Sequence, residues 1–171
     1  RLGLVGKRVV VYLGVLTEYQ GVDDLLAAWP AVTAAVPDAH LLLMGHPNVE
    51  RYRARVAAAG LADSVTLTGR IDYGESPRYL ALGEVAVSAK HSSTEANGKL
   101  VNYMAMGLPC VAYDSPVARE LLGEAGVYAR MRDPPAVRTA PPGVLRDPPE
   151  EKLLGPAPRE RGARRARRPG R

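Results

Sequence analysis

Residues 90–99, Lys-His-Ser-Ser-Thr-Glu-Ala-Asn-Gly-Lys, hold the densest group of polar and charged side chains in the first 130 residues. They lead directly into an apolar segment that predicts a helix over about 98–106. A helix N-terminus offers unpaired backbone N–H groups and the positive end of the helix dipole. Asn97, Gly98 and Lys99 therefore predict a site for a phosphate or diphosphate, and an ordinary helix start capped by a serine or threonine fits the same pattern.

Glu95 precedes this predicted anion site by two residues. A carboxylate accepts hydrogen bonds from a diol, so it suits a ligand that carries hydroxyl groups as well as phosphate. A sugar linked to a phosphate has both kinds of group, which makes a phosphorylated sugar the ligand class that this loop favours.

The loop from Gly14 to Gly21 is the second glycine-bounded stretch between a predicted strand and a predicted helix. It contains neither Gly-x-Gly-x-x-Gly nor a Walker ending of Gly-Lys-Ser/Thr, so the usual dinucleotide and ATP sites are not supported. The three histidines, His40, His46 and His91, lack the spacing of metal ligands, and we expect no metal. His40 is expected to flank a strand, and His46 and His91 to lie in loops.

Two further kinds of nucleophile are unpromising. Ser92 and Ser93 lack the Gly-x-Ser-x-Gly elbow of a hydrolase. Cys110, the single cysteine, begins an apolar strand and is expected to be buried as a small hydrophobic residue. One cysteine also excludes an intramolecular disulfide and a multi-cysteine metal site.

Hydrophobic patterning predicts strands that alternate with helices along most of the chain. The expected strands are 8–13, 41–44, 65–68, 85–88, 110–113 and 126–128, and the expected helices are 22–36, 49–59, 76–82, 98–106 and 116–122. This alternation predicts an α/β fold, a Rossmann-like parallel sheet of about six strands with helices on both faces. Ligands of such sheets bind beyond the carboxyl ends of the strands, at the loops that begin at Gly14, Gly45, Gly69, Ser88 and Tyr113.

Length and charge limit the class of protein. A chain of 171 residues fits one domain, and no apolar stretch approaches the length of a membrane span, which predicts a soluble chain. The net charge of +5 is uneven: residues 1–130 carry 12 Lys and Arg against 13 Asp and Glu, and residues 131–171 carry 11 against 5. The body is therefore close to neutral, and the excess positive charge belongs to the end of the chain.

Proline usage marks the same boundary, because nine of the 15 prolines follow residue 130 and all eight tyrosines precede it. Proline removes a backbone donor and clashes with the preceding helical turn. We therefore predict a Rossmann-like domain at 1–130 and, at 131–171, a Pro/Arg-rich, poorly ordered tail without long helices.

Five segments, in order and at suitable spacing, make the chain resemble a known family. They are 11–28, 37–45, 60–69, 82–88 and the most specific one, Thr94-Glu-Ala-Asn-Gly-Lys-Leu-Val-Asn-Tyr-Met-Ala-Met-Gly-Leu-Pro-Cys-Val-Ala112. Together they resemble the C-terminal, donor-binding domain of retaining glycosyltransferases of family 4. Whole enzymes of that family consist of two facing Rossmann-like domains, the GT-B fold.

The resemblance implies a role for each matching position. Gly14, Thr17 and Gln20 would approach the donor diphosphate, Gly69, Arg70 and Ile71 would lie beside the nucleotide base, and Glu95 would face the transferred sugar as the catalytic residue. Asn97, Gly98, Lys99 and Leu100 would hold the phosphates, and Asn102 stands where the family has a glutamate that binds the ribose hydroxyls. The family uses a nucleoside diphosphate sugar as donor and needs no cofactor or metal.

Three positions depart from the family pattern. Basic residues are usual where this chain has Val15 and Gln20, and the second of two paired glutamates is replaced by Asn102. Lys90 and Lys99 are candidates to compensate for the missing charge, because an anion at a helix N-terminus gains from a nearby cation.

The leading hypothesis is the donor-binding half of a retaining glycosyltransferase in glycan, polysaccharide or glycolipid synthesis. Because Arg1 is no initiator and no acceptor domain is present, we expect a fragment of a longer cytoplasmic enzyme, active only with its N-terminal acceptor domain and able to associate with the inner face of the membrane. The alternative is a non-catalytic Rossmann-like scaffold or nucleotide-binding module that has lost transfer activity. A nucleic-acid binder that uses the Arg-rich tail ranks last, because the tail has no interleaved aromatic residues.

Overall fold

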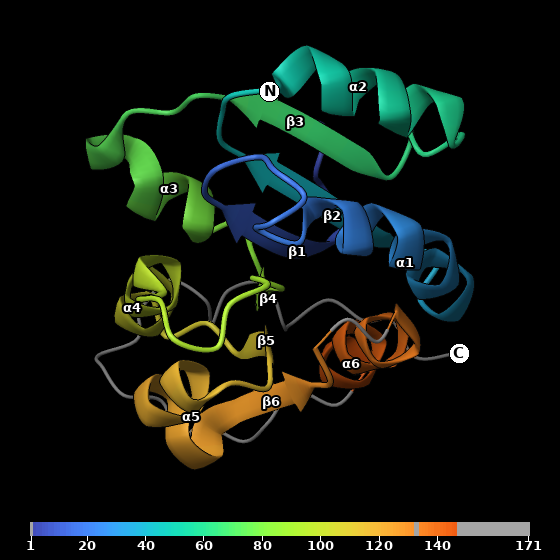
Figure 1. The fold of residues 1–171 in the computed structure, drawn as a ribbon. Helices are drawn as coiled ribbons and strands as arrows, with labels where there is room; N and C mark the ends of the chain where they lie inside the picture. The colour runs from blue at the N-terminus through green and yellow to red at the C-terminus, as the bar shows by residue number, and fades with distance from the viewer. Residues whose placement is uncertain (1, 132–133, 147–171) are drawn as a thin grey trace.

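The computed structural model describes residues 2–131 and 134–146, and within them six parallel strands form one sheet in the order β3-β2-β1-β4-β5-β6 (Figure 1). This confirms the expected Rossmann-like fold class. The strands are β1 (Arg8–Leu13), β2 (Ala39–Met44), β3 (Val65–Gly69), β4 (Val85–Ser88), β5 (Cys110–Tyr113) and β6 (Gly126–Ala129).

The helices that connect these strands begin and end within about two residues of the predicted positions. They are α1 (Val22–Ala35), α2 (Val49–Ala58), α3 (Ser76–Leu80), α4 (Gly98–Ala105) and α5 (Pro116–Leu122), with short 3-10 turns at Tyr73–Glu75 and Gly123–Ala125. A sixth helix in the described part, α6 (Pro134–Arg146), follows β6.

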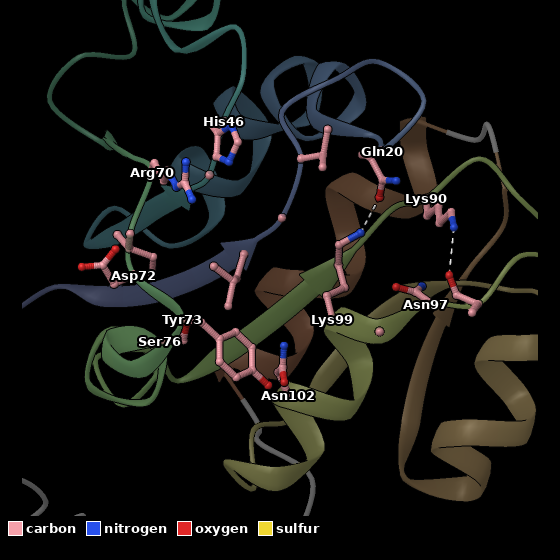
Figure 2. A pocket seen from close by; sticks show the side chains of 17 residues that line it. Gln20, His46, Arg70, Asp72, Tyr73, Ser76, Lys90, Asn97, Lys99 and Asn102 are labelled. Atoms are coloured by element: carbon pink, nitrogen blue, oxygen red, sulfur yellow. Dashed lines mark hydrogen bonds between the residues drawn. The ribbon is translucent and has the colours of Figure 1, made fainter.

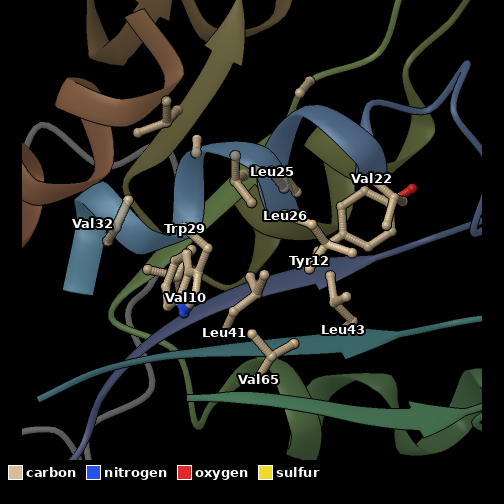
Figure 3. Packing of buried hydrophobic residues seen from close by; sticks show 14 of the residues in the cluster. Val10, Tyr12, Val22, Leu25, Leu26, Trp29, Val32, Leu41, Leu43 and Val65 are labelled. Atoms are coloured by element: carbon tan, nitrogen blue, oxygen red, sulfur yellow. The ribbon is translucent and has the colours of Figure 1, made fainter. Parts of the chain in front are cut away.

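The sheet has a hydrophobic layer on each face, because successive side chains of a strand point to opposite sides. In β1, Val10 and Tyr12 belong to the cluster covered by α1, α2 and α6, whereas Val9 and Val11 belong to the cluster covered by α3, α4 and α5. Trp29 of α1 lies over Val10 in the first cluster (Figure 3). All these strand residues are buried, so the continuous apolar run at 9–12 is explained by burial on both faces.

Helix α6 overturns the prediction that the tail holds no long helix, at least for residues 134–146. It packs along α1, with Val144 and Leu145 buried in the same cluster as Trp29. Arg146 also donates a hydrogen bond to the carbonyl of Ala35 at the end of α1, 2.5 Å away. Tertiary packing therefore outweighs the low helix propensity of its prolines. Residues 147–171 lie outside the described part of the chain.

The strand order reverses beside β1. The chain runs outward from β1 to β2 and β3, and then returns to place β4 on the other side of β1, with Val10 opposite Leu41 on one side and Val85 on the other. The loops that follow β1 and β4 consequently diverge to opposite faces of the sheet. This is the position at which open parallel sheets have a crevice for ligands.

Candidate functional site

A pocket of about 500 Å³ opens at this crevice, at the carboxyl edge of the sheet (Figure 2). Its walls come from the loops after β1, β2, β3 and β4 and from the first turns of α4. Four of the five predicted loops therefore meet here, and the loop that begins at Tyr113 does not contribute to the lining. Below, residues 14–21 are called the β1–α1 loop and residues 89–97 the β4–α4 loop.

The start of α4 forms one wall of the pocket. Asn97 is the N-cap residue, but its side chain makes no capping hydrogen bond. Instead it is buried against Ser88, with Nδ2 2.9 Å and Oδ1 3.2 Å from the Ser88 Oγ. The structure therefore differs from the alternative of a helix start capped by serine or threonine, and no capping side chain occupies the N-terminal N–H groups of α4.

Lys99 extends from α4 across the end of β1 to the opposite wall. Its Nζ donates a hydrogen bond to the Gln20 Oε1, 2.5 Å away, and lies 5.4 Å from the centre of the Tyr12 ring. Its Cε passes 2.9 Å from the point that a Cβ at Gly14 would occupy. Burial lowers the pKa of Lys99 to about 8, and the positive charge of Lys90 contributes to the decrease.

Lys90 is a second cation in the pocket lining, and it is buried, with a side chain only 9% exposed. It donates a hydrogen bond to the carbonyl of Ala96 at 2.9 Å and pairs with the Glu95 Oε2 at 3.0 Å. Hydrogen bonds from Lys90 and then Tyr19 lower the pKa of Glu95, so this carboxylate is ionised at neutral pH. Glu95 itself is exposed and does not line the pocket, but its ion pair joins it to a residue that does.

The structure brings most of the predicted site residues together. Those that line the pocket are Gly14, Gln20, Arg70, Ile71, Asn97, Gly98, Lys99 and Asn102. Those that do not are Glu95, Thr17, Gly69 and Leu100. The last three residues contribute to the fold itself. The carbonyl of Thr17 accepts a turn hydrogen bond, the carbonyl of Gly69 accepts a hydrogen bond from Gly45, and the Leu100 side chain of α4 is fully buried. The binding roles of all twelve residues stay predictions.

Four lining residues with polar side chains have no role predicted from the sequence: His46, Asp72, Tyr73 and Ser76. His46 and Arg70 lie together on one side of the pocket, away from Asn97 on α4 (Figure 2). His46 directly follows Gly45, and Asp72 and Tyr73 continue the loop after Gly69. The rule that ligands bind beyond the carboxyl ends of strands was the signal that could have identified them.

Cys110 and His40, which also have chemically reactive side chains, are both buried. Burial raises the pKa of Cys110 to about 12, as expected for an unreactive buried thiol. His40 lies inside β2, not beside a strand, and its Nε2 is 2.8 Å from the Thr66 Oγ1.

Over residues 2–131 and 134–146, His, Cys, Asp and Glu form no group of three that could hold a metal ion. Every helix in those ranges is too short or too polar to cross a membrane.

Comparison with protein families agrees with the fold and the position of the pocket. Residues 7–147 match the family described as glycosyl transferases group 1. The chain belongs to this family. The match includes every strand and every pocket-lining residue, and it confirms the resemblance found in the sequence.

Individual relatives support the same family. The chain is 30% identical, over 168 residues, to the GDP-mannose-dependent alpha-(1-6)-phosphatidylinositol monomannoside mannosyltransferase of Mycolicibacterium smegmatis. The match covers 93% of this chain and 44% of the relative. It is 28% identical to the alpha-D-kanosaminyltransferase of Streptomyces kanamyceticus, over 86% of this chain and 39% of the relative. The chain thus spans less than half the length of the relatives it matches.

Solved structures show the same fold. HepE of Anabaena, in complex with UDP and glucose, superimposes with a TM-score of 0.75 at 19% identity, over 85% of this chain and 41% of HepE. Sucrose-phosphate synthase of Thermosynechococcus elongatus superimposes with a TM-score of 0.71 at 25% identity, over 84% of this chain and 37% of the synthase.

Proposed function

We propose that this chain is the donor-binding half of a retaining glycosyltransferase, which transfers a sugar from a nucleoside diphosphate sugar to an acceptor held by a separate domain. The observation that carries the proposal is the pocket at the switch point, where the start of α4, without a side-chain cap, meets the buried Lys90 and the partly buried Lys99. The mannosyltransferase relative is named as GDP-mannose-dependent, and HepE binds UDP and glucose. Synthesis of a glycan, polysaccharide or glycolipid is the process that such relatives favour.

The electrostatics of the pocket favour a ligand with more than one negative charge. Lys90 and Lys99 both line it, and among the described residues the carboxylate paired with either of them is Glu95. The helix dipole of α4 adds partial positive charge at the same wall. A diphosphate would bring two neighbouring anionic groups to this wall, and the hydroxyls of a sugar would find acceptors at the pocket edge.

Transfer in the whole enzyme would depend on positioning and on stabilising the leaving diphosphate by fixed positive groups. We assign the base to the side of Arg70 and Ile71, the ribose to Asn102, and the phosphates to Gly14, Asn97, Gly98 and Lys99. Glu95 would orient the transferred sugar. The proposal includes no metal and no cofactor, and it places the enzyme in the cytoplasm, at the inner membrane face when the acceptor is a lipid.

Calorimetric titration of the 171-residue chain with UDP, GDP and ADP tests the donor site directly. We expect at least one of these nucleotides to bind with a dissociation constant below the millimolar range. If none binds at millimolar concentration, the proposed function is wrong.

Replacement of Glu95 tests its assignment to the sugar. Glu95→Ala should weaken binding of the nucleotide sugar more than binding of the corresponding bare nucleotide. Glu84→Ala is the matched control, because Glu84 pairs with Arg8 at 2.9 Å next to the start of β4, away from the carboxyl edge. Equal losses for nucleotide and nucleotide sugar would remove Glu95 from the sugar site.

A non-catalytic donor-binding module is the second candidate, and one observation favours it. Val15, Gln20 and Asn102, the three departures from the family pattern, all line the pocket. A polypeptide that joins this chain to an acceptor domain distinguishes the two functions. Donor binding without turnover on any acceptor would support the non-catalytic module, and sugar transfer would exclude it.

A further inference from the structure

Lys99 is a partly buried cation without a charged partner in the described part of the chain. Its Nζ donates a hydrogen bond to the neutral amide of Gln20 and makes a cation–π contact with the Tyr12 ring. The salt bridges within residues 2–131 and 134–146 do not include Lys99, whereas Lys90 pairs with Glu95. The two lysines of the pocket therefore differ in how their charge is balanced.

An unbalanced charge at this depth is unfavourable. Removal of an ammonium group from water is unfavourable unless an opposite charge or strong hydrogen bonds compensate for it. Burial is the main cause that lowers the pKa of Lys99 to about 8, and the neighbouring charge of Lys90 lowers it further. An anion bound between the two lysines would remove this penalty, so Lys99 is arranged for a ligand and not for the stability of the free chain.

The course of the side chain is also defined. The Lys99 Cε passes close to Gly14: a Cβ on residue 14 would lie 2.9 Å from this Cε. The Lys99 side chain can take this course because glycine has no side chain. Beyond Gly14, the Nζ reaches the Gln20 Oε1 at 2.5 Å. Gln20 takes one of the three ammonium protons, and two remain for other acceptors.

We propose that Lys99 delivers from α4 the positive charge that balances the donor diphosphate, and that Gln20 is a positioning residue that holds the Lys99 ammonium at that place. The inference rests on the proposed function, which already assigns Lys99 to the phosphates, and it adds the role of Gln20 in holding the Lys99 ammonium. The sequence resemblance leads us to expect a basic residue at position 20, and Gln20 stands there instead. The Lys99 Nζ lies against this Gln20 side chain, so the charge reaches the same place from the opposite wall of the pocket.

An exchange of the two side chains tests the proposal. Lys99→Gln should weaken binding of UDP or GDP by about 10- to 100-fold, as expected for a lost charge-assisted contact to phosphate. Binding of uridine or guanosine, which lack phosphate, should change by less than about twofold. The double variant Gln20→Lys/Lys99→Gln should restore most of the lost affinity, because it returns one cation to the same place from the other wall.

Lys7→Gln is the matched control, since it removes the same charge from an exposed lysine just before β1, at the opposite edge of the sheet from the pocket. It should leave all four affinities unchanged. Circular dichroism and thermal unfolding of each variant show whether it is folded before its affinity is compared.

Proton uptake gives a second measurement that a purely structural role for Lys99 would not affect. At pH 8, where free Lys99 is about half protonated, bound diphosphate should raise its pKa and draw up to about half a proton from the buffer. Titrations in buffers of different ionisation enthalpy measure this number, which should fall toward zero in Lys99→Gln.

The outcomes separate this inference from the proposed function. If the wild-type chain binds no nucleotide, the proposed function fails and the inference falls with it. If wild type binds UDP or GDP and Lys99→Gln binds equally well, the donor site stands and the role of Lys99 is overturned. Loss of affinity in Lys99→Gln without recovery in the double variant would overturn the role of Gln20.

Discussion

The two loops that face each other across the pocket are held in place by different kinds of interaction. The β1–α1 loop is fixed by its backbone: Gly14 donates a hydrogen bond to the carbonyl of Met44, 2.9 Å away, and Gly21 packs directly on the backbone of Ala89. Its polar contribution to the pocket lining is the neutral amide of Gln20.

The β4–α4 loop is fixed mainly by polar side chains. Asn97 is held by Ser88, Lys90 by the carbonyl of Ala96, and His91 by Asp24 on α1, with the His91 Nε2 2.6 Å from the Asp24 Oδ2. This loop and the first turn of α4 carry both lysines of the pocket. The first loop therefore determines the shape of the site and the second its charge, so substitutions in the two loops should have different consequences.

The largest effect is expected where the two loops touch. Gly21 has a φ of 79°, and a Cβ there would lie 2.0 Å from the carbonyl oxygen of Ala89. Gly21→Ala combines a left-handed backbone with a clash against backbone atoms, and should lower the free energy of unfolding by about 3 to 5 kcal/mol. Urea unfolding measures the change. Gly74→Ala, at a position with open space around it, should stay within about 0.5 kcal/mol; a similarly small change for Gly21→Ala would show that the loops are not tightly packed.

Lys99→Met should separate stability from binding. The pKa of about 8 in the folded chain lies below the ordinary value of 10.5, so the charged form opposes folding below pH 8. This penalty declines as pH rises from about 8 to 10.5, because lysine in the unfolded chain then also loses its proton. At pH 7 the variant should be more stable than wild type by about 2 kcal/mol and bind nucleotide diphosphates weakly.

Urea unfolding of wild type and Lys99→Met at pH 7, 8.5 and 9.5 measures this difference, which should become smaller at each step. Lys7→Met, at an exposed lysine, should show no comparable gain. A stability difference that stays constant with pH would mean that the charge of Lys99 is not the cause.

The pair of Ser88 and Asn97 tests the polar support of the second loop. Ser88→Ala leaves the buried amide of Asn97 without its hydrogen-bond partner, and should lower the free energy of unfolding by about 1 to 2 kcal/mol. Because Asn97 lines the pocket, nucleotide affinity should fall as well. Ser93→Ala, at an exposed position in the same loop, is the control for both measurements. Equal behaviour of the two serine variants would contradict a supporting role for Ser88.

Sequence patterns predicted the elements of this fold well for a physical reason. Strands such as 8–13 are buried on both faces and helices such as α1 carry an apolar stripe, so hydrophobic periodicity alone identifies them. The rule for parallel sheets then pointed to the correct edge. Helix α6 was missed because its stability comes from contacts of Val144 and Leu145 with distant residues, which local propensity does not contain.

The internal arrangement of the site was less predictable. Gln20 and Lys99 are 79 residues apart and meet because β4 lies beside β1. Alternation of strands and helices does not specify that order, since it fixes the layers and not which strands are neighbours. The sequence therefore named both residues as binding candidates but could not show that one holds the other.

The smallest effect on stability, with a clear effect on binding, is expected at two neighbouring aspartates on α1. Asp24 accepts a hydrogen bond from Tyr113 and contacts His91 of the β4–α4 loop. Asp23 instead accepts hydrogen bonds from two residues of α2, Tyr52 at 2.6 Å and Arg55. Asp23→Ala and Asp24→Ala should each lower the free energy of unfolding by about 1 kcal/mol. Only Asp24→Ala should also weaken nucleotide binding, because it releases the β4–α4 loop, which carries Lys90. Calorimetric titration of both variants with UDP or GDP measures this difference. If Asp23→Ala weakens binding as much as Asp24→Ala, the first turn of α1 supports the whole pocket, and the proposed division of labour between the two loops is wrong.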